Sequence, residues 1–208
     1  MNTRLVGSEM CIRDSVYAHV GTHRQHTLGD TMSKLKELTW ENHKKAERMT
    51  HARKLLKGME PEEYHRFIYN QCVQYGALED QARERGLLKG IEGICRVPGM
   101  VEDLTELEQE HGFDRGTTEL CPVVHEYTDY VEGLDDDGIL AHLYVRHFGE
   151  LHGGQMIKKR APGSGKMYDF DNAKQIIEDV RAKLHDGMAP EANVCFEYAM
   201  KLFQELDS

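Results

Sequence analysis

A helical stretch between residues 142 and 160 carries three glycines in its interior: Gly149, Gly153 and Gly154. Each interior glycine costs a helix about 1 kcal/mol relative to alanine. Their clustering therefore indicates that something must approach the backbone closely, either a tightly packed helix or a flat ligand. The charged and titratable side chains among the glycines favour a ligand that takes part in a reaction. These side chains are Arg146, Glu150 and His152.

Arg146 and Glu150 are four residues apart, a spacing that allows an exposed ion pair worth roughly a few tenths of a kcal/mol. Gly149 and Gly153 lie on the same general face of the helix. A flat molecule pressed against these glycines would therefore meet Glu150 at its edge. A carboxylate in that position could organise water and deliver protons.

A histidine near the start of the chain offers a second chemical group. His43 shares a helical face with Leu35 and Thr39, so its side chain is expected to point toward the core or a pocket. A lone histidine on such a face is more often a hydrogen-bonded core residue than a metal ligand. Glu47 favours the metal-ligand interpretation. It lies one turn later in the helix, and its carboxylate could accept a hydrogen bond from the N–H of one ring nitrogen. The other nitrogen would then be free to bind a metal.

The elements that must position these groups are helices. We expect helices over residues 33–56, 61–86, 101–111, 122–131, 171–184 and 190–206, and a long glycine-containing helix that starts at the aspartates 135–137 and ends before residues 161–165. No segment alternates with period two for long enough to form a sheet. The sequence therefore predicts a single all-α domain over residues 32–208.

Composition narrows the class of protein. The chain has 208 residues, is 39% hydrophobic and has a formal charge of −10, which argues against nucleic acid or an anionic membrane as its main partner. No apolar run approaches the roughly 20 residues that a membrane span needs. The five cysteines form no CxxC pair, a pattern typical of free thiols in a reducing compartment. We expect a soluble cytoplasmic protein, by default a monomer.

The first 31 residues are expected to lie outside this domain. Residues 5–15 resemble the direct translation of a transposase-type sequencing adapter, and no apolar segment of a signal peptide is present. We interpret residues 1–31 as a non-native or disordered extension, with the native start near Met32.

Two motifs together resemble one known family. Residues 142–159 resemble the distal helix of haem oxygenases, and residues 35–47 resemble their proximal helix. The sequence Tyr-Gly-Ala-Leu-Glu at 75–79 is similar to part of the family's second helix, and residues 196–206 are similar to its last. The two main motifs lie about a hundred residues apart in the expected order, and the resemblance extends from about residue 33 to 206.

This resemblance implies a helical haem-oxygenase-like fold that holds haem between the proximal and distal helices. His43 would be the axial ligand of the haem iron, steadied by Glu47, and Phe196 would be among the haem contacts. Gly149 and Gly153 would let the distal helix lie against the haem face. That closeness restricts dioxygen to one side of the ring, so that the haem's own meso carbon is attacked.

The family's distal aspartate corresponds to Glu150. The resemblance implies that this carboxylate holds a water network, together with Arg146 and Tyr75, that delivers protons to dioxygen on the haem. Three further residues are candidates to bind the haem propionates: Lys36, Tyr144 and Arg181.

Three positions depart from the family pattern. Glu150 is one methylene longer than aspartate, and Ala199 stands where the family has an asparagine of the water network. His152 replaces a small serine and adds a titratable ring that could contact the network or the iron. These changes leave haem binding expected and bear on the rate of turnover and the position of ring opening.

The implied reaction is the oxidative cleavage of haem, which is both cofactor and substrate, by O₂ and electrons to biliverdin, carbon monoxide and Fe²⁺. Electrons would come from an external donor, a ferredoxin in a bacterial or phage setting or a similar reductase. A downstream bilin reductase is a further candidate partner. The donor would dock near a basic cluster that otherwise only complements a helix C-terminus: Lys158, Lys159 and Arg160.

Two other functions remain open from the sequence. A non-haem di-iron oxidase with the same helical fold could draw carboxylate and imidazole ligands from a larger set: Glu47, Glu79, Glu150, His43 and His147. Alternatively, the changes at Glu150 and His152 could leave a haem-binding protein without turnover.

Overall fold

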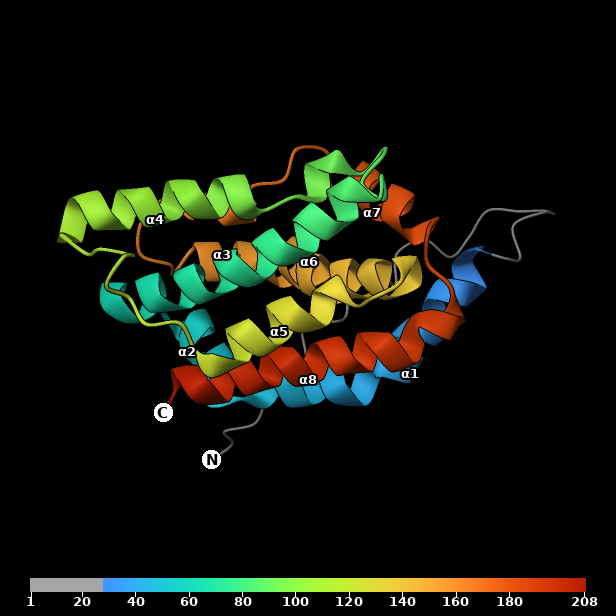
Figure 1. Cartoon of the computed structure of the whole chain (residues 1–208), viewed down its shortest axis with the longest axis horizontal. Helices are drawn as coiled ribbons and strands as arrows, with labels where there is room; N and C mark the ends of the chain where they lie inside the picture. Colours follow the sequence, from blue (N-terminus) through green and yellow to red (C-terminus); the bar gives the residue numbers. More distant parts are fainter. Residues whose placement is uncertain (1–27) are drawn as a thin grey trace, which may run out of the picture.

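The computed structural model describes residues 28–208, and all regular elements in this part of the chain are helices (Figure 1). The all-α prediction is therefore confirmed. The α-helices are α1 (Leu28–Arg48), α2 (Thr50–Lys57), α3 (Pro61–Glu84), α4 (Val97–His111), α5 (Pro122–Glu132), α6 (Asp136–Lys158), α7 (Ala173–Arg181) and α8 (Ala189–Leu206). Single 3₁₀ turns lie at η2 (Glu92–Ile94), η3 (Lys166–Tyr168) and η4 (Asp186–Met188).

The first expected helix, residues 33–56, is wrong as a single element, because the chain breaks at Met49. The backbone of Met49 is extended, with φ −65° and ψ 152°. Neither glycine nor proline occurs there. The break instead turns α2 so that His51 is buried against Phe203, with its Nδ1 3.1 Å from the carboxylate of Asp207. Tertiary packing at the end of α8 therefore overrides local helix propensity.

The other boundaries agree with the sequence within a few residues. Among the helices after α2 the largest difference is at α4, which begins at Val97 instead of residue 101, with a proline in its first turn. Asp135 caps α6 as expected, since its side chain accepts a hydrogen bond from the backbone N–H of Gly138 at 2.8 Å. The division at residue 32 stays a prediction: α1 starts at Leu28, and residues 1–27, with the adapter-like segment, lie outside the described residues.

α6 is the central helix of the bundle, packed against both α3 and α8 (Figure 1). Every residue from Gly138 to Phe148 is buried, whereas most of the helix beyond Phe148 is at least partly exposed. The first half of α6 is thus a core element on all sides. The second half presents the glycine-containing face.

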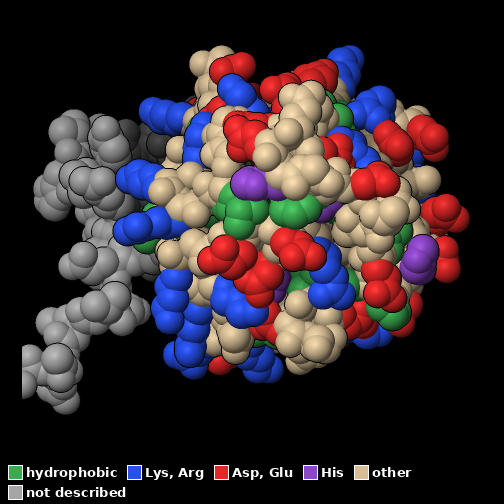
Figure 2. Space-filling view, turned by 90° about the vertical axis from the view of Figure 1, so that its left-hand side faces the viewer, with side chains coloured by type: hydrophobic (Ala, Val, Ile, Leu, Met, Phe, Trp, Pro, Cys, Tyr) green, Lys and Arg blue, Asp and Glu red, His purple; other side chains and the backbone are tan. Residues whose placement is uncertain are grey.

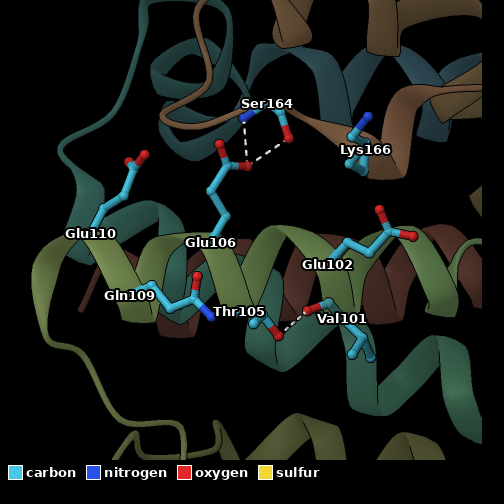
Figure 3. Close-up of a pocket in the computed structure, with 8 residues that line it drawn as sticks. All are labelled: Val101, Glu102, Thr105, Glu106, Gln109, Glu110, Ser164 and Lys166. Atoms are coloured by element: carbon cyan, nitrogen blue, oxygen red, sulfur yellow. Dashed lines mark hydrogen bonds between the residues drawn. The ribbon is translucent and has the colours of Figure 1, made fainter.

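The segment after α6 returns to α4 and fixes the far side of the bundle. The buried carboxylate of Asp103 accepts backbone N–H groups of Lys166 at 2.6 Å and Met167 at 2.9 Å. Glu106 accepts the backbone N–H of Ser164 at 2.9 Å, and both residues line the pocket shown in Figure 3. These contacts seat Tyr168 against Gly154 of α6.

No helix of the described region is both long and apolar enough to cross a membrane. The four cysteines of that region are free thiols, as the sequence predicts.

Gly154 is predicted to be required for packing. A Cβ at this position would lie 2.6 Å from Cδ1 of the buried Tyr168 ring. We expect Gly154→Ala to lower the free energy of unfolding by about 1–2 kcal/mol, since overpacking outweighs the gain in helix propensity. Urea unfolding measures this. The matched control is Gly76→Ala in α3, where a Cβ meets nothing within 4 Å and stability should rise; equal effects at both positions would contradict the packing role.

Candidate functional site

The two groups singled out by the sequence lie on helices that share a neighbour. His43 is on α1 and the glycine face, defined as Gly149 and Gly153, is on α6. α8 packs against both helices and contributes Phe196, whose ring meets the His43 ring edge-on with centroids 5.8 Å apart. The fold therefore holds α1 and α6 in fixed positions around α8.

His43 has the features of an available ligand. Its side chain is 37% exposed, its ring stacks on Trp40, and its Nδ1 lies 3.7 Å from Oε2 of Glu47. That nitrogen is buried without a hydrogen bond in the described structure. Burial lowers the pKa of His43, an effect that the Glu47 carboxylate partly offsets. The imidazole is therefore neutral at pH 7, the form in which histidine binds metals.

The glycines of α6 divide into two kinds. At Gly149 and Gly153 an added Cβ would meet nothing within 4 Å, so the space in front of both is open. Gly154, by contrast, is buried against Tyr168. Helix packing therefore accounts for Gly154 alone, and the other two glycines form a bare surface on which a flat molecule could rest.

Glu150 borders this bare surface and is held by Tyr75. The tyrosine hydroxyl donates to Oε1 of Glu150 at 3.4 Å, while Oε2 is buried and unpartnered in the described structure. Burial raises the pKa of Glu150 to about 7, although Tyr75 and the charges of Arg96 and Arg146 act in the opposite direction. A carboxyl group with this pKa can both accept and release a proton near neutrality.

Arg146 is not part of an exposed ion pair with Glu150, so that interpretation of the sequence is wrong. The side chain is buried, its Nε donates to the Tyr127 hydroxyl at 2.9 Å, and its Nη1 donates to Oε1 of Gln71 at 3.1 Å. Nη2 is buried without a partner in the part of the chain described. Sequence reasoning missed Tyr127 and Gln71, because they reach Arg146 from α5 and α3.

Two of the three candidate contacts for anionic groups, Tyr144 and Arg181, lie near each other. The nearly buried hydroxyl of Tyr144 interacts with Thr39 of α1, and the positive charge of Arg181 at the end of α7 reaches it. Nε of Arg181 is buried without a partner within the described residues. Lys36 is exposed on α1, and its charge contributes to the lowered pKa of His43. These three sequence candidates thus come from three different helices.

The ligands proposed for a di-iron centre do not come together. His147 and Glu79 form a buried pair, with Nε2 and Oε1 3.1 Å apart, and His43 with Glu47 forms a separate one. Across residues 28–208, no group of three or more His, Cys, Asp or Glu side chains is placed to hold a metal ion. The di-iron alternative therefore has no support from the geometry.

The basic cluster after α6 is only partly available. Lys158 forms an ion pair with Asp169, whereas Lys159 and Arg160 are exposed. Basic side chains also gather along one edge of the view in Figure 2, so local positive regions exist despite the net negative charge.

Comparison with known proteins identifies the family of this chain. The model of the family described as "Heme oxygenase" matches residues 30–205. The heme oxygenase of Pyropia yezoensis is 29% identical, with 85% of each chain covered, and heme oxygenase 2 of Mus musculus is 28% identical, with 88% of this chain and 67% of the mouse protein covered. The chain belongs to the heme oxygenase family.

Solved structures show the same fold. Heme oxygenase-2 from Synechocystis, crystallised with heme and NO, is 25% identical with a TM-score of 0.70 over 84% of each chain. The heme oxygenase of Leptospira interrogans has a TM-score of 0.72 at 24% identity, covering 83% of this chain and 98% of that one.

The raised pKa of Glu150 predicts a specific dependence of stability on pH. Between pH 4.5 and 7 the folded protein retains a proton on Glu150 that the unfolded chain has lost, so this group lowers stability as pH rises through that range. Glu150→Gln cannot ionise. The difference in free energy of unfolding between Glu150→Gln and the parent protein should therefore shift by about 3 kcal/mol in favour of the variant as the pH rises from 4.5 to 8.

Urea unfolding of the two proteins at several pH values measures this difference. The exposed Glu197→Gln on α8 is the control for the loss of one charge. A gain for Glu150→Gln that stays constant with pH would contradict the assignment.

Proposed function

We propose that this heme oxygenase family member binds haem between His43 and the glycine face and opens it with O₂ and electrons to biliverdin, carbon monoxide and Fe²⁺. The observation that carries this proposal is the open space in front of Gly149 and Gly153 in a helix that is otherwise central to the core. Family membership names the molecule that fits such a surface.

The residues present suit this group. His43 offers a neutral imidazole, and the Glu47 carboxylate near Nδ1 would fix the ring and make the other nitrogen more basic. Phe196 supplies an apolar wall beside the same ring. Lys36, Tyr144 and Arg181 would bind the propionates, since two cations and a hydroxyl match the charge and acceptor character of carboxylates.

Haem, when bound, supplies the iron at which O₂ is activated, and the protein's own part is positioning and proton supply. Gly149 and Gly153 would bring the backbone of α6 against one face of the ring and so limit the space beside it. Glu150, with Tyr75 on Oε1 and a free Oε2, would hold water there and exchange protons with it. The anchored guanidinium of Arg146 keeps positive charge next to this carboxyl group.

The electron donor would be a ferredoxin or a similar reductase that docks on the basic cluster of Lys158, Lys159 and Arg160. The exposed Lys159 and Arg160 are the members best placed to meet an acidic partner. We further propose that the protein works in the cytoplasm as a monomer and can hand its product to a bilin reductase.

Removal of the iron ligand tests the proposal directly. Purified protein mixed with haemin should develop a Soret band, and added ferredoxin, ferredoxin reductase and NADPH should convert that band into a bilin spectrum. His43→Ala should lose the normal axial spectrum and turnover, and added imidazole should restore the spectrum. His125→Ala, an exposed histidine on α5, is the control. A Soret band that forms but stays stable under reduction would indicate haem binding without turnover.

The glycine face predicts opposite effects on stability and on binding. Because a Cβ at Gly153 meets open space, Gly153→Ala and Gly153→Leu should keep or raise the stability of the haem-free protein, by up to about 1 kcal/mol. Haem affinity should fall in the order Gly, Ala, Leu, by at least about tenfold for Leu. Haem titration and urea unfolding measure the two effects, and tight haem binding by Gly153→Leu would exclude this face as the haem contact.

A further inference from the structure

His152 lies within the glycine face itself. It stands one residue before Gly153 on α6, and its ring is exposed. Its Nδ1 is 2.9 Å from the backbone carbonyl oxygen of Phe148, one turn earlier. A carbonyl oxygen can only accept a hydrogen bond, so Nδ1 must carry the hydrogen. In the neutral ring this leaves Nε2 with a free lone pair.

This arrangement is the one found in metal-binding histidines. Such residues usually donate one ring N–H to a carbonyl or carboxylate, which fixes the tautomer and the ring orientation and raises the basicity of the other nitrogen. The Phe148 ring, 5.6 Å away between centroids, also restrains the His152 ring. No hydrogen bond to Nε2 occurs among the described residues, so this nitrogen is available.

The surroundings place this nitrogen near the proposed haem position. Open space lies in front of Gly149 and Gly153 on either side of His152 in the sequence. His43 on α1 and His152 on α6 each have Nδ1 next to a possible acceptor, the carboxylate of Glu47 and the backbone carbonyl of Phe148.

We propose that His152 is a second axial ligand for the haem iron, on the face opposite His43. The proposal rests on the haem site of the proposed function. Imidazole nitrogen suits iron, and a second histidine ligand would give a six-coordinate resting state. In that state the imidazole separates the backbone of α6 from the iron, so the close approach of Gly149 and Gly153 belongs to the state in which His152 has left the iron. An external ligand must then displace His152 before it can bind, so its apparent affinity is reduced by the fraction of protein in which the iron is free.

The experiment compares ferric haem complexes of the full chain and of two variants by optical and electron paramagnetic resonance spectroscopy. The parent protein should be low-spin with two imidazole ligands. His152→Ser, which removes the ring at an exposed position, should become water-ligated and bind azide at least about tenfold tighter. His125→Ser on α5 is the matched control and should resemble the parent protein.

The outcomes separate this proposal from the one on which it rests. Two results would overturn the role of His152 while haem binding stands. In the first, the parent protein forms a Soret band but its spectrum is that of water-ligated haem. In the second, the parent spectrum is low-spin and His152→Ser leaves it unchanged. Failure of the parent protein to bind haemin would overturn the proposed function itself. Equal azide affinities of the parent protein and His152→Ser would also count against the second ligand.

Discussion

A helix at the centre of a bundle buries side chains on every side, whereas a helix that receives a flat ligand must leave one face bare. α6 meets both demands along its length. Its first half is buried all round, and its second half leaves open space in front of Gly149 and Gly153. Each bare glycine costs about 1 kcal/mol of helix stability. The packing of the first half, and the contact of Gly154 with Tyr168, offset that cost.

The helices and the residues within one helix could be predicted from the sequence, because periodicity and i, i+4 spacing are local properties. The pairing of His43 with Glu47 is of this kind. The break at Met49 and the partners of Arg146 depend on how distant helices meet, and no local pattern encodes that. The glycines show the same limit: Gly153 and Gly154 are adjacent in sequence, yet only the position of Tyr168 reveals that one is open and the other is packed.

The structure shows how two residues of the predicted site, Glu150 and His152, are held in place. Glu150 is held by the hydroxyl of Tyr75, which donates to its Oε1 at 3.4 Å. His152 does not extend freely into solvent, because the carbonyl of Phe148 fixes its ring. The larger side chain therefore has a defined orientation, which a serine at this position would not provide.

The pKa of Glu150 depends on where Arg146 directs its hydrogen bonds. An arginine that donated two of them to the carboxylate would hold the acid ionised. Here Nε donates to the hydroxyl of Tyr127, and Nη1 donates to Oε1 of Gln71. The Tyr127 hydroxyl is in turn 2.9 Å from Nδ1 of His142. Arg146 thus contributes charge without a hydrogen bond to Glu150. Burial outweighs that charge, so the pKa rises to about 7, and the acid retains a proton that it can exchange near neutral pH.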